Sequence, residues 1–441
     1  MMTENNTESV TNYNNAQFGP NLRGYIIFWI GQLISLLGSS VVQFSIIWWI
    51  TVETGSELFL AISIFLGFGP TMLFTPIAGV FVDRWSRKKL IASVDFLQAV
   101  ATVGLIFSFM VGIANIWFVL AIITLRGIFQ AFHGPAVQAI IPLLVPKDKL
   151  SRMNGLDYLF NGFILMIGPL VGALMLNYFI LQEVLWIDAL TFMIAIIPTI
   201  IITIPSVKTP TSKKERTPFL AELSEGFIFI RNQQGLLALL AVFTAANFFM
   251  RPLYVLMPLF VKDVHLGGPE ELAFLFAVLQ AGMIGASLIM SSWKGFDNNA
   301  RGVALGIFMM YFGLMVCSFA PQGLFPLLIL GVFLNGFGLP VANVSSQTIW
   351  QKIVPPEKLG RVYSVRLTIA QGSGPIAIIL SGIFGELFGI IPVLVTASLF
   401  GVLFLGYSWF FTRFRQVEKT VTTLETPSIV PVTTEPHLIT D

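Results

Sequence analysis

The sequence predicts an all-α membrane protein in which twelve transmembrane helices form two pseudosymmetric six-helix bundles. Three observations lead to this fold class: an apolar composition, long uninterrupted apolar segments, and an internal repeat. Of the 441 residues, 55% are hydrophobic and 11% are charged, whereas soluble domains carry about 25% charged residues. The chain is therefore expected to fold within a lipid bilayer.

Twelve apolar segments are long enough to cross a bilayer, which takes about 20 residues in a helix. They lie at 24–51, 58–81, 90–112, 117–143, 156–180, 185–206, 236–262, 272–294, 302–320, 325–350, 362–388 and 391–412. Because the segments are continuously apolar, a transmembrane β-barrel, whose strands alternate, is disfavoured. The first segment lacks the basic region and cleavage site of a signal peptide, so we expect it to be retained.

The basic residues indicate how the helices are oriented. With the N-terminus in the cytoplasm, 21 of the 25 Lys and Arg residues fall on the inner side and only Lys262 falls outside. The other three, Arg126, Arg251 and Arg366, lie within helices. Because positive charge resists translocation, we expect a multi-pass protein of the cell membrane with both termini cytoplasmic.

A hydrophilic connection after the sixth segment divides the chain into two halves. The two tails contain too few apolar residues to form an ordered core. The expected organisation is a disordered cytoplasmic tail (1–22), an N-terminal six-helix bundle (23–206), a cytoplasmic linker with an amphipathic helix (207–235), a C-terminal six-helix bundle (236–415) and a disordered cytoplasmic tail (416–441).

The amphipathic helix of the linker has a recognisable start, because Thr217-Pro218 resembles a helix N-terminus. The helix is interpreted as a strap on the inner membrane face, with a partner-binding or regulatory role as the alternative.

An internal repeat relates the two halves. Val145-Pro-Lys-Asp-Lys-Leu-Ser-Arg152 is echoed by Val354-Pro-Pro-Glu-Lys-Leu-Gly-Arg361, 209 residues later. At the same shift, Leu125-Arg126-Gly127 matches Leu334-Asn335-Gly336, and Gly168-Pro169 matches Gly374-Pro375 at a shift of 206. Parallel six-helix repeats are one of the architectures of secondary transporters, which bind substrate between the repeats.

Two motifs resemble signatures of a known family. Gly79-x-x-x-Asp83-Arg84-x-x-Arg87-Lys88 resembles the loop between the second and third helices of the major facilitator superfamily, and Gly168-Pro-Leu-Val-Gly172 resembles the fifth-helix signature of its antiporters. Gly31-Gln32 and Ile187-Asp188 are similar to the macrolide-efflux branch of the drug:proton antiporters. The resemblance covers Gly24 to Arg415 and implies the major facilitator fold, with alternating-access export of hydrophobic or amphipathic, macrolide-like compounds in exchange for protons.

The resemblance also implies a conformational latch at the cytoplasmic face. Asp83 is expected to face the start of the eleventh helix near Arg361, and Arg87 is expected to contact Asp148. These contacts require the cytoplasmic ends of the two halves to meet, as in an outward-facing state. The full set of expected latch residues is Gly79, Asp83, Arg84, Arg87, Lys88, Asp148 and Arg361. The alternative is that the basic residues only hold the loop inside.

The glycines of the fifth helix predict close packing. Gly168 and Gly172 lack side chains, so a neighbouring helix can approach closely, and Pro169 removes a backbone hydrogen bond and permits a bend. Gly374 and Pro375 repeat the pattern in the second half. We expect a packing hinge here, and the resemblance implies that it limits leak.

Charged residues inside the bilayer are functional candidates because burying them is costly. Arg126 and Asp188 are the expected proton-coupling residues; the repeat counterpart of Arg126 is the neutral Asn335. Asp188 lies near the outer end of its segment, so a fixed helix-end ion pair is the alternative. Asp95 and Asp157 lie near cytoplasmic helix ends, where snorkelling or loop pairing explains them about as well as a functional role does.

Polar residues on the first, fourth, seventh and tenth helices are expected to line a substrate cavity. They are Gln32, Gln43, Gln130, His133, Asn247, Arg251 and Asn335. Arg251 either forms a fixed structural pair or lines the cavity, pairing with an acidic group or favouring an anionic substrate. His133 either titrates or is hydrogen-bonded scaffolding.

Several functions are excluded by missing motifs. The chain has no Gly-x-x-x-x-Gly-Lys-Ser/Thr phosphate loop, no metal-ligand cluster, no nucleophile–base motif, and only Cys317 for a disulfide. We expect no enzyme activity, no cofactor, no metal, no ATP and no nucleic acid. The expected partners are a small-molecule substrate, protons and the lipid bilayer, with the chain acting as a monomer. The alternatives are export of a native metabolite such as a siderophore or lipid, and a non-transporting membrane receptor.

Overall fold

The computed structural model describes residues 21–203 and 219–418, and every regular element within these ranges is helical. The N-terminal half contains α2 (Leu22–Thr54), α3 (Glu57–Arg84), α4 (Arg87–Val111), α5 (Ile116–Gln138), α6 (Ile141–Leu144), η2 (Lys147–Lys149), α7 (Leu150–Leu176) and α8 (Leu181–Ile201). The C-terminal half contains α9 (Phe219–Asn232), α10 (Leu236–Leu259), η3 (Phe260–Val264), α11 (Pro269–Ser292), α12 (Asn299–Ser318), α13 (Phe325–Ile353), α14 (Pro356–Phe388), α15 (Ile390–Phe411) and η4 (Arg413–Gln416).

Twelve helices in the described ranges are long and apolar enough to cross a membrane, and they correspond one to one with the twelve predicted segments. Local sequence sets several of their ends. The side chain of Asn115 accepts a hydrogen bond from the Phe118 amide (3.0 Å) and so caps the start of α5. Gly55 and Gly112 end α2 and α4 with φ of +55° and +76°, a conformation that glycine adopts at little cost.

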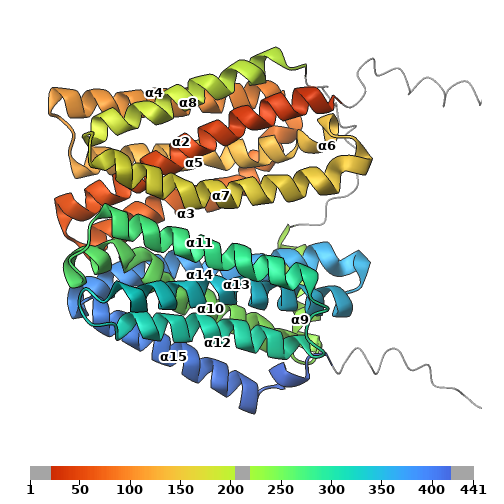
Figure 1. The fold of residues 1–441 in the computed structure, drawn as a ribbon. Coiled ribbons are helices and arrows are strands. Elements are labelled where there is room, and N and C mark those ends of the chain that lie inside the picture. The colour runs from red at the N-terminus through yellow and green to blue at the C-terminus, as the bar shows by residue number, and fades with distance from the viewer. Residues whose placement is uncertain (1–20, 204–218, 419–441) are drawn as a thin grey trace, which may run out of the picture.

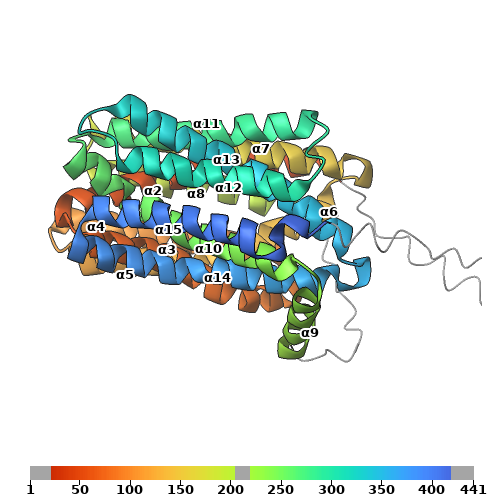
Figure 2. The same cartoon turned by 90° about the horizontal axis from the view of Figure 1, so that it is seen from below.

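The helices form two bundles, with α2 to α8 in one and α10 to α15 in the other (Figure 1). Consecutive helices run in opposite directions, so the connections alternate between two ends of the molecule. One of these, here named the basic end, carries α6, η2 and α9 (Figures 1 and 2). The other, the opposite end, carries connections 55–56, 112–115, 177–180, 265–268, 319–324 and 389. The predicted two-bundle fold is confirmed.

The two bundles pack tightly at the opposite end. A Cβ added to Gly382 of α14 would lie 2.4 Å from the Ala61 Cβ of α3. Ser56 donates a hydrogen bond to the Glu386 carboxylate (2.9 Å), and Asn177 donates one to Glu270. At the basic end, by contrast, a Cβ added to Gly79 or Gly360 would meet open space. The hydrogen bonds and close packing that join the two halves thus lie at the opposite end.

The structure refines the predicted segment boundaries. Helix α9 lies within the predicted linker (207–235), while its expected start at Thr217-Pro218 lies outside the described residues. The C-terminal tail was expected to be disordered from residue 416. Val417 is instead buried, and Glu418 accepts hydrogen bonds from the backbone and side chain of Asn299 (2.6 and 2.7 Å). The ordered chain therefore extends at least to Glu418, because its carboxylate caps the start of α12.

Candidate functional site

A central cavity lies between the two bundles and has two adjoining lobes. The first, of about 760 Å³, is lined mainly by α2, α3, α5 and α7. The second, of about 870 Å³, is lined mainly by α10, α11, α13 and α14. Six residues line both lobes: Ser40, Gln43, Ile47, Phe68, Leu165 and Arg251. Each lobe has the volume of a site for a drug-sized molecule.

The strongest ionic feature of the first lobe is the pair of Arg126 on α5 and Asp188 on α8. Arg126 lies at the cavity wall, and its guanidinium contacts the Asp188 carboxylate, which is fully buried behind it. Ser39 donates to one carboxylate oxygen (2.7 Å) and Thr102 to the other (2.8 Å). Residues of three helices thus converge on the buried carboxylate of a fourth helix, α8. The sequence identified both charges, but Asp188 lies two turns inside α8, which begins at Leu181, and not at a helix end.

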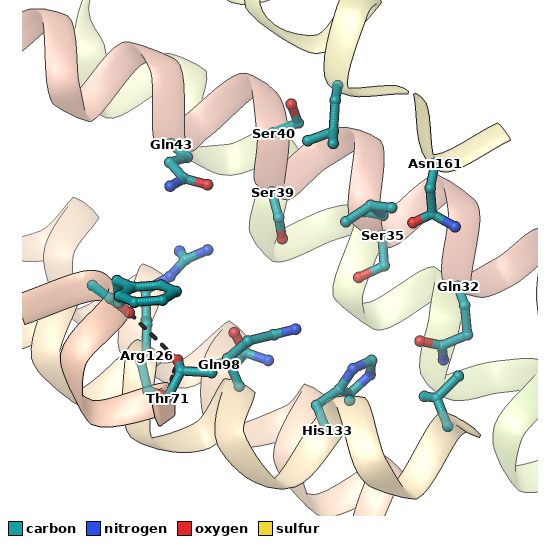
Figure 3. A pocket seen from close by; sticks show the side chains of 18 of the residues that line it. Gln32, Ser35, Ser39, Ser40, Gln43, Thr71, Gln98, Arg126, His133 and Asn161 are labelled. Carbon is teal, nitrogen blue, oxygen red and sulfur yellow. Dashed lines mark hydrogen bonds between the residues drawn. The ribbon is translucent and has the colours of Figure 1, made fainter. Parts of the chain in front are cut away.

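A second acid–base pair, missed by the sequence interpretation, lies nearer the basic end. The His133 Nε2 is 3.0 Å from Asp95 Oδ1, at ion-pair distance but outside hydrogen-bond geometry. Gln32 donates to the other Asp95 oxygen (3.4 Å). Asp95 is fully buried, so neither snorkelling nor loop pairing explains it. Polar side chains of α2 face those of α4 and α5 across this lobe (Figure 3).

A signal for the second pair was present in the sequence. Asp95 and Thr102 are seven residues apart on α4, and Arg126 and His133 are seven apart on α5. Residues seven apart lie on the same helix face, and α4 and α5 are antiparallel neighbours. Matching the two faces therefore places Asp95 beside His133 and Thr102 beside Arg126, and Thr102 does accept a hydrogen bond from Arg126 (2.6 Å).

Asp157 on α7 is the one Asp or Glu that lines the first lobe, among the described residues. Its Oδ1 accepts a hydrogen bond from the Trp29 indole (2.8 Å), and its backbone oxygen accepts one from the Asn161 side chain (2.7 Å). Loop pairing was the expected explanation, but the partner is a cavity-lining tryptophan of α2.

Most residues predicted to line the cavity do so. Gln32, Gln43, Gln130 and His133 line the first lobe, Asn247 lines the second, and Gln43 and Arg251 line both. The prediction for Asn335 is wrong, because its side chain is fully buried outside both lobes. Asn335 accepts a hydrogen bond from the hydroxyl of Tyr254 (2.6 Å), so it positions a cavity residue instead of lining the cavity.

The glycine motifs of α7 and α14 lie at close helix contacts. A Cβ added to Gly168 would be 2.2 Å from Ser40 Oγ of α2, and one added to Gly172 would be 2.9 Å from the Val41 carbonyl oxygen. A Cβ on Gly374 would be 3.3 Å from the Arg251 guanidinium. Pro169 and Pro375 lie inside α7 and α14. The contacts agree with the packing role; the hinge role stays a prediction.

Among the latch side chains that the structure describes, none contacts a latch residue of the other half. Arg361 pairs with Glu225 of α9 in its own half (2.5 Å). In the other half, Arg87 donates to the Ala139 carbonyl (3.4 Å) and Lys88 to the Ile202 carbonyl (2.9 Å). Asp148 is exposed. The side chains of Asp83 and Arg84 lie outside what the structure describes.

The arrangement of the first lobe permits coupled proton binding. A proton that binds to Asp188 neutralises its carboxylate and so weakens the contact with Arg126. His133 is the one histidine that lines the cavity, among the residues that the structure describes. Within the same described ranges, no three His, Cys, Asp or Glu side chains converge to hold a metal ion.

Comparison with known proteins agrees with the architecture. The sequence profile of the Major Facilitator Superfamily matches residues 28–301. Macrolide efflux protein A of Streptococcus pyogenes is 32% identical over 379 residues, 86% of this chain and 92% of that protein. The multidrug efflux pump Tap of Mycolicibacterium fortuitum is 24% identical over 417 residues, 92% of this chain and 98% of that protein.

The solved structure of a bacterial homologue of the iron transporter ferroportin in its inward-facing state has a similar fold. Its TM-score is 0.65 at 12% identity, and the match covers 88% of this chain and 98% of that one. Two bundles of membrane-spanning helices around a central cavity are the architecture of a membrane transporter. The chain belongs to the Major Facilitator Superfamily. Its predicted resemblance to the macrolide-efflux branch is confirmed.

Proposed function

We propose that this protein exports hydrophobic or amphipathic, macrolide-like compounds across the cell membrane in exchange for protons. The observation that carries the proposal is the buried Arg126–Asp188 pair, which faces the cavity and would respond to a proton. An ion pair inside a membrane bundle is costly to maintain, so a functional role is the first explanation for it. The similarity to macrolide efflux protein A supports the direction of transport and the substrate class.

The distribution of charge supports an inward-facing conformation for this structure. If the basic end lies in the cytoplasm, as the excess of Lys and Arg there favours, the open side of the cavity faces the cytoplasm and the closed side faces outward. A compound could then enter the cavity from the cytoplasm or from the inner leaflet. Protons entering from outside after the switch would bind Asp188, release Arg126, and return the transporter inward.

His133 and Asp157 lie between Asp188 and the cytoplasmic mouth and offer a route for proton release. Along α5, His133 is seven residues from Arg126, about 10 Å at 1.5 Å per residue. One or two waters could bridge such a gap in a polar cavity. In this mechanism Asp95 positions and polarises the imidazole.

Replacing His133 with asparagine should slow proton-driven transport, because it removes the imidazole of this route while keeping a polar side chain at the same position. The measurement is the initial rate of compound uptake into everted vesicles at a fixed pH gradient. His265→Asn is the matched control, since His265 lies at the opposite end, and burial lowers its pKa so that its ring stays neutral near pH 7. An unchanged rate for His133→Asn would remove His133 from the proton route.

The latch is proposed for the outward-facing state, in which the basic ends of the two halves meet. Arg361 would then exchange Glu225 for contacts with the loop that contains Asp83. Asp83→Asn should lower turnover by up to roughly fivefold, the effect of about 1 kcal/mol for an exposed charge interaction, with substrate binding unchanged. Asp297→Asn, an exposed carboxylate in another basic-end connection, is the control. Equal turnover in Asp83→Asn and wild type would count against the latch.

The proposed function is tested by transport in everted membrane vesicles. A pH gradient, acidic inside, should drive accumulation of a radiolabelled macrolide in vesicles that contain the protein, and collapse of the gradient should release it. Vesicles without the protein provide the background. Accumulation that requires ATP hydrolysis but ignores the pH gradient would contradict the proposal.

A further inference from the structure

The second lobe of the cavity contains positive charge without a negative partner. Arg251 on α10 and Arg366 on α14 both line it. Among the described residues, no carboxylate oxygen lies within 4.0 Å of either guanidinium, whereas Arg126 in the first lobe has Asp188. The two halves of the cavity therefore differ in charge: acidic residues with partners on one side, and unpaired basic residues on the other.

Arg251 has fewer interaction partners than Arg366. Its guanidinium lies 5.8 Å from the centre of the Phe68 ring, which belongs to the other bundle, and passes over Gly374. It donates no hydrogen bond to any side chain or carbonyl in the described ranges. A guanidinium carries five N–H donors, so most of its hydrogen-bonding capacity is directed to the cavity. Because Arg251 lines both lobes, a molecule in either lobe can reach it.

Arg366 is held in place by aromatic rings and one amide. It donates a hydrogen bond to Gln347 Oε1 (2.7 Å), and the rings of Phe243, Trp350 and Tyr363 have their centres 5.6–5.8 Å from it. Such cation–π contacts stabilise the charge but do not neutralise it. Phe243 precedes Arg251 by eight residues on α10, so Arg366 lies about 12 Å nearer the basic end.

The remaining wall of the second lobe combines apolar side chains with a few neutral polar ones. Phe276, Leu279 and Met310 supply apolar surface, while Asn247 and Gln371 supply hydrogen-bonding groups. Unpaired charge in a low-dielectric cleft creates a field that concentrates counter-ions. A carboxylate is the natural complement of a guanidinium, because both can form two parallel hydrogen bonds.

We propose that the second lobe is a binding site for amphipathic organic anions, with the acidic group of the ligand on Arg251 and its apolar body against Phe276 and Met310. Arg366, nearer the basic-end mouth, attracts the anion and guides it inward. This inference rests on the proposed transport function and adds a substrate class, organic carboxylates with an apolar body, that the similarity to macrolide exporters does not supply.

The test compares three probes that share one ring system and differ in charge: 1-naphthaleneacetate, 1-naphthaleneacetamide and 2-(1-naphthyl)ethylamine. Their affinities for the full-length protein in phosphatidylcholine nanodiscs are measured by titration calorimetry. Wild type should bind the carboxylate at least about tenfold more tightly than the amide, since hydrogen bonds to charged groups are the strong ones, and should bind the amine most weakly. Arg251→Gln should bring the carboxylate to within about twofold of the amide.

The controls keep the result decisive. Lys294→Gln removes an exposed basic-end charge outside the cavity and should retain the full preference. Arg251→Lys keeps the positive charge and should retain part of the preference for the carboxylate. This variant therefore separates loss of charge from loss of folding. Equal affinity of wild type for carboxylate and amide, or an intact preference in Arg251→Gln, would overturn the proposal.

Two further outcomes are distinguishable. If anionic phosphatidylglycerol in the nanodiscs abolishes carboxylate binding, a lipid phosphate occupies the lobe, and the proposal of a soluble ligand is overturned. The binding test needs no pH gradient, so a carboxylate preference without proton-driven efflux would support the site and contradict only the proposed function. Proton-driven macrolide efflux without a carboxylate preference would support the proposed function and contradict the anion-binding site.

Discussion

Asp188→Asn should abolish transport driven by a pH gradient, leaving the rate at that of vesicles without the protein. The variant removes the buried carboxylate on which Ser39, Thr102 and Arg126 converge. It also leaves the partly buried Arg126 without a carboxylate partner, and removing one member of a buried pair costs about 3–5 kcal/mol of stability. The measurements are gradient-driven uptake in everted vesicles and thermal unfolding of the purified protein.

A double variant separates coupling from folding. Arg126→Gln combined with Asp188→Asn removes both charges and should regain most of the lost stability, because no unpaired charge remains. It should still exchange labelled for unlabelled compound in the absence of a gradient, yet fail to accumulate compound when a gradient is imposed. Gradient-driven accumulation by the double variant at the wild-type level would contradict the role of this pair.

Gly382→Val should prevent the two halves from closing at the opposite end. Real Cβ atoms do not approach within 3.0 Å of another heavy atom, and here a Cβ would lie 2.4 Å from the Ala61 Cβ. Helices α3 and α14 must then separate, which disfavours the conformation described here. Transport should fall to near background, because alternating access needs both closed states.

A cysteine reporter detects this shift directly. The only native cysteine, Cys317, is buried, so labelling of an introduced cysteine has a low background. Gln138→Cys lies at the basic-end mouth of the first lobe. Its maleimide labelling in everted vesicles should fall several-fold when Gly382→Val is added. Gly372→Val on the same helix, where a Cβ meets open space, is the matched control. Unchanged labelling with Gly382→Val would show that this contact does not govern closure.

Most of the fold could be predicted because a bilayer imposes a simple rule. Every spanning segment must satisfy its own backbone hydrogen bonds, so length and apolarity alone locate the helices. The end of the chain was predicted less well. The sequence after Arg415 is polar, but Glu418 caps the start of α12, a tertiary contact that local composition does not reveal.

The candidate site was predicted in part, since single charged residues in apolar segments are conspicuous. Arg126 and Asp188 were found in this way. Asp95 was interpreted as a helix-end residue because only its distance from the loop along the sequence was considered. Its partner on the neighbouring helix α5, His133, was not taken into account. Asn335 was placed in the cavity by analogy with Arg126 in the repeat, but α13 turns that position toward Tyr254 and Met250. Pseudosymmetry relates backbones, and the side chains that fill the space between helices need not follow it.

Exchange of compound for protons is tested most directly with the purified protein in liposomes that contain a pH-sensitive dye. When a macrolide gradient is imposed with no initial pH difference, movement of the compound should drive protons in the opposite direction, and the double variant Arg126→Gln with Asp188→Asn should move compound without moving protons. Compound movement by wild type with no accompanying proton flux would contradict the account.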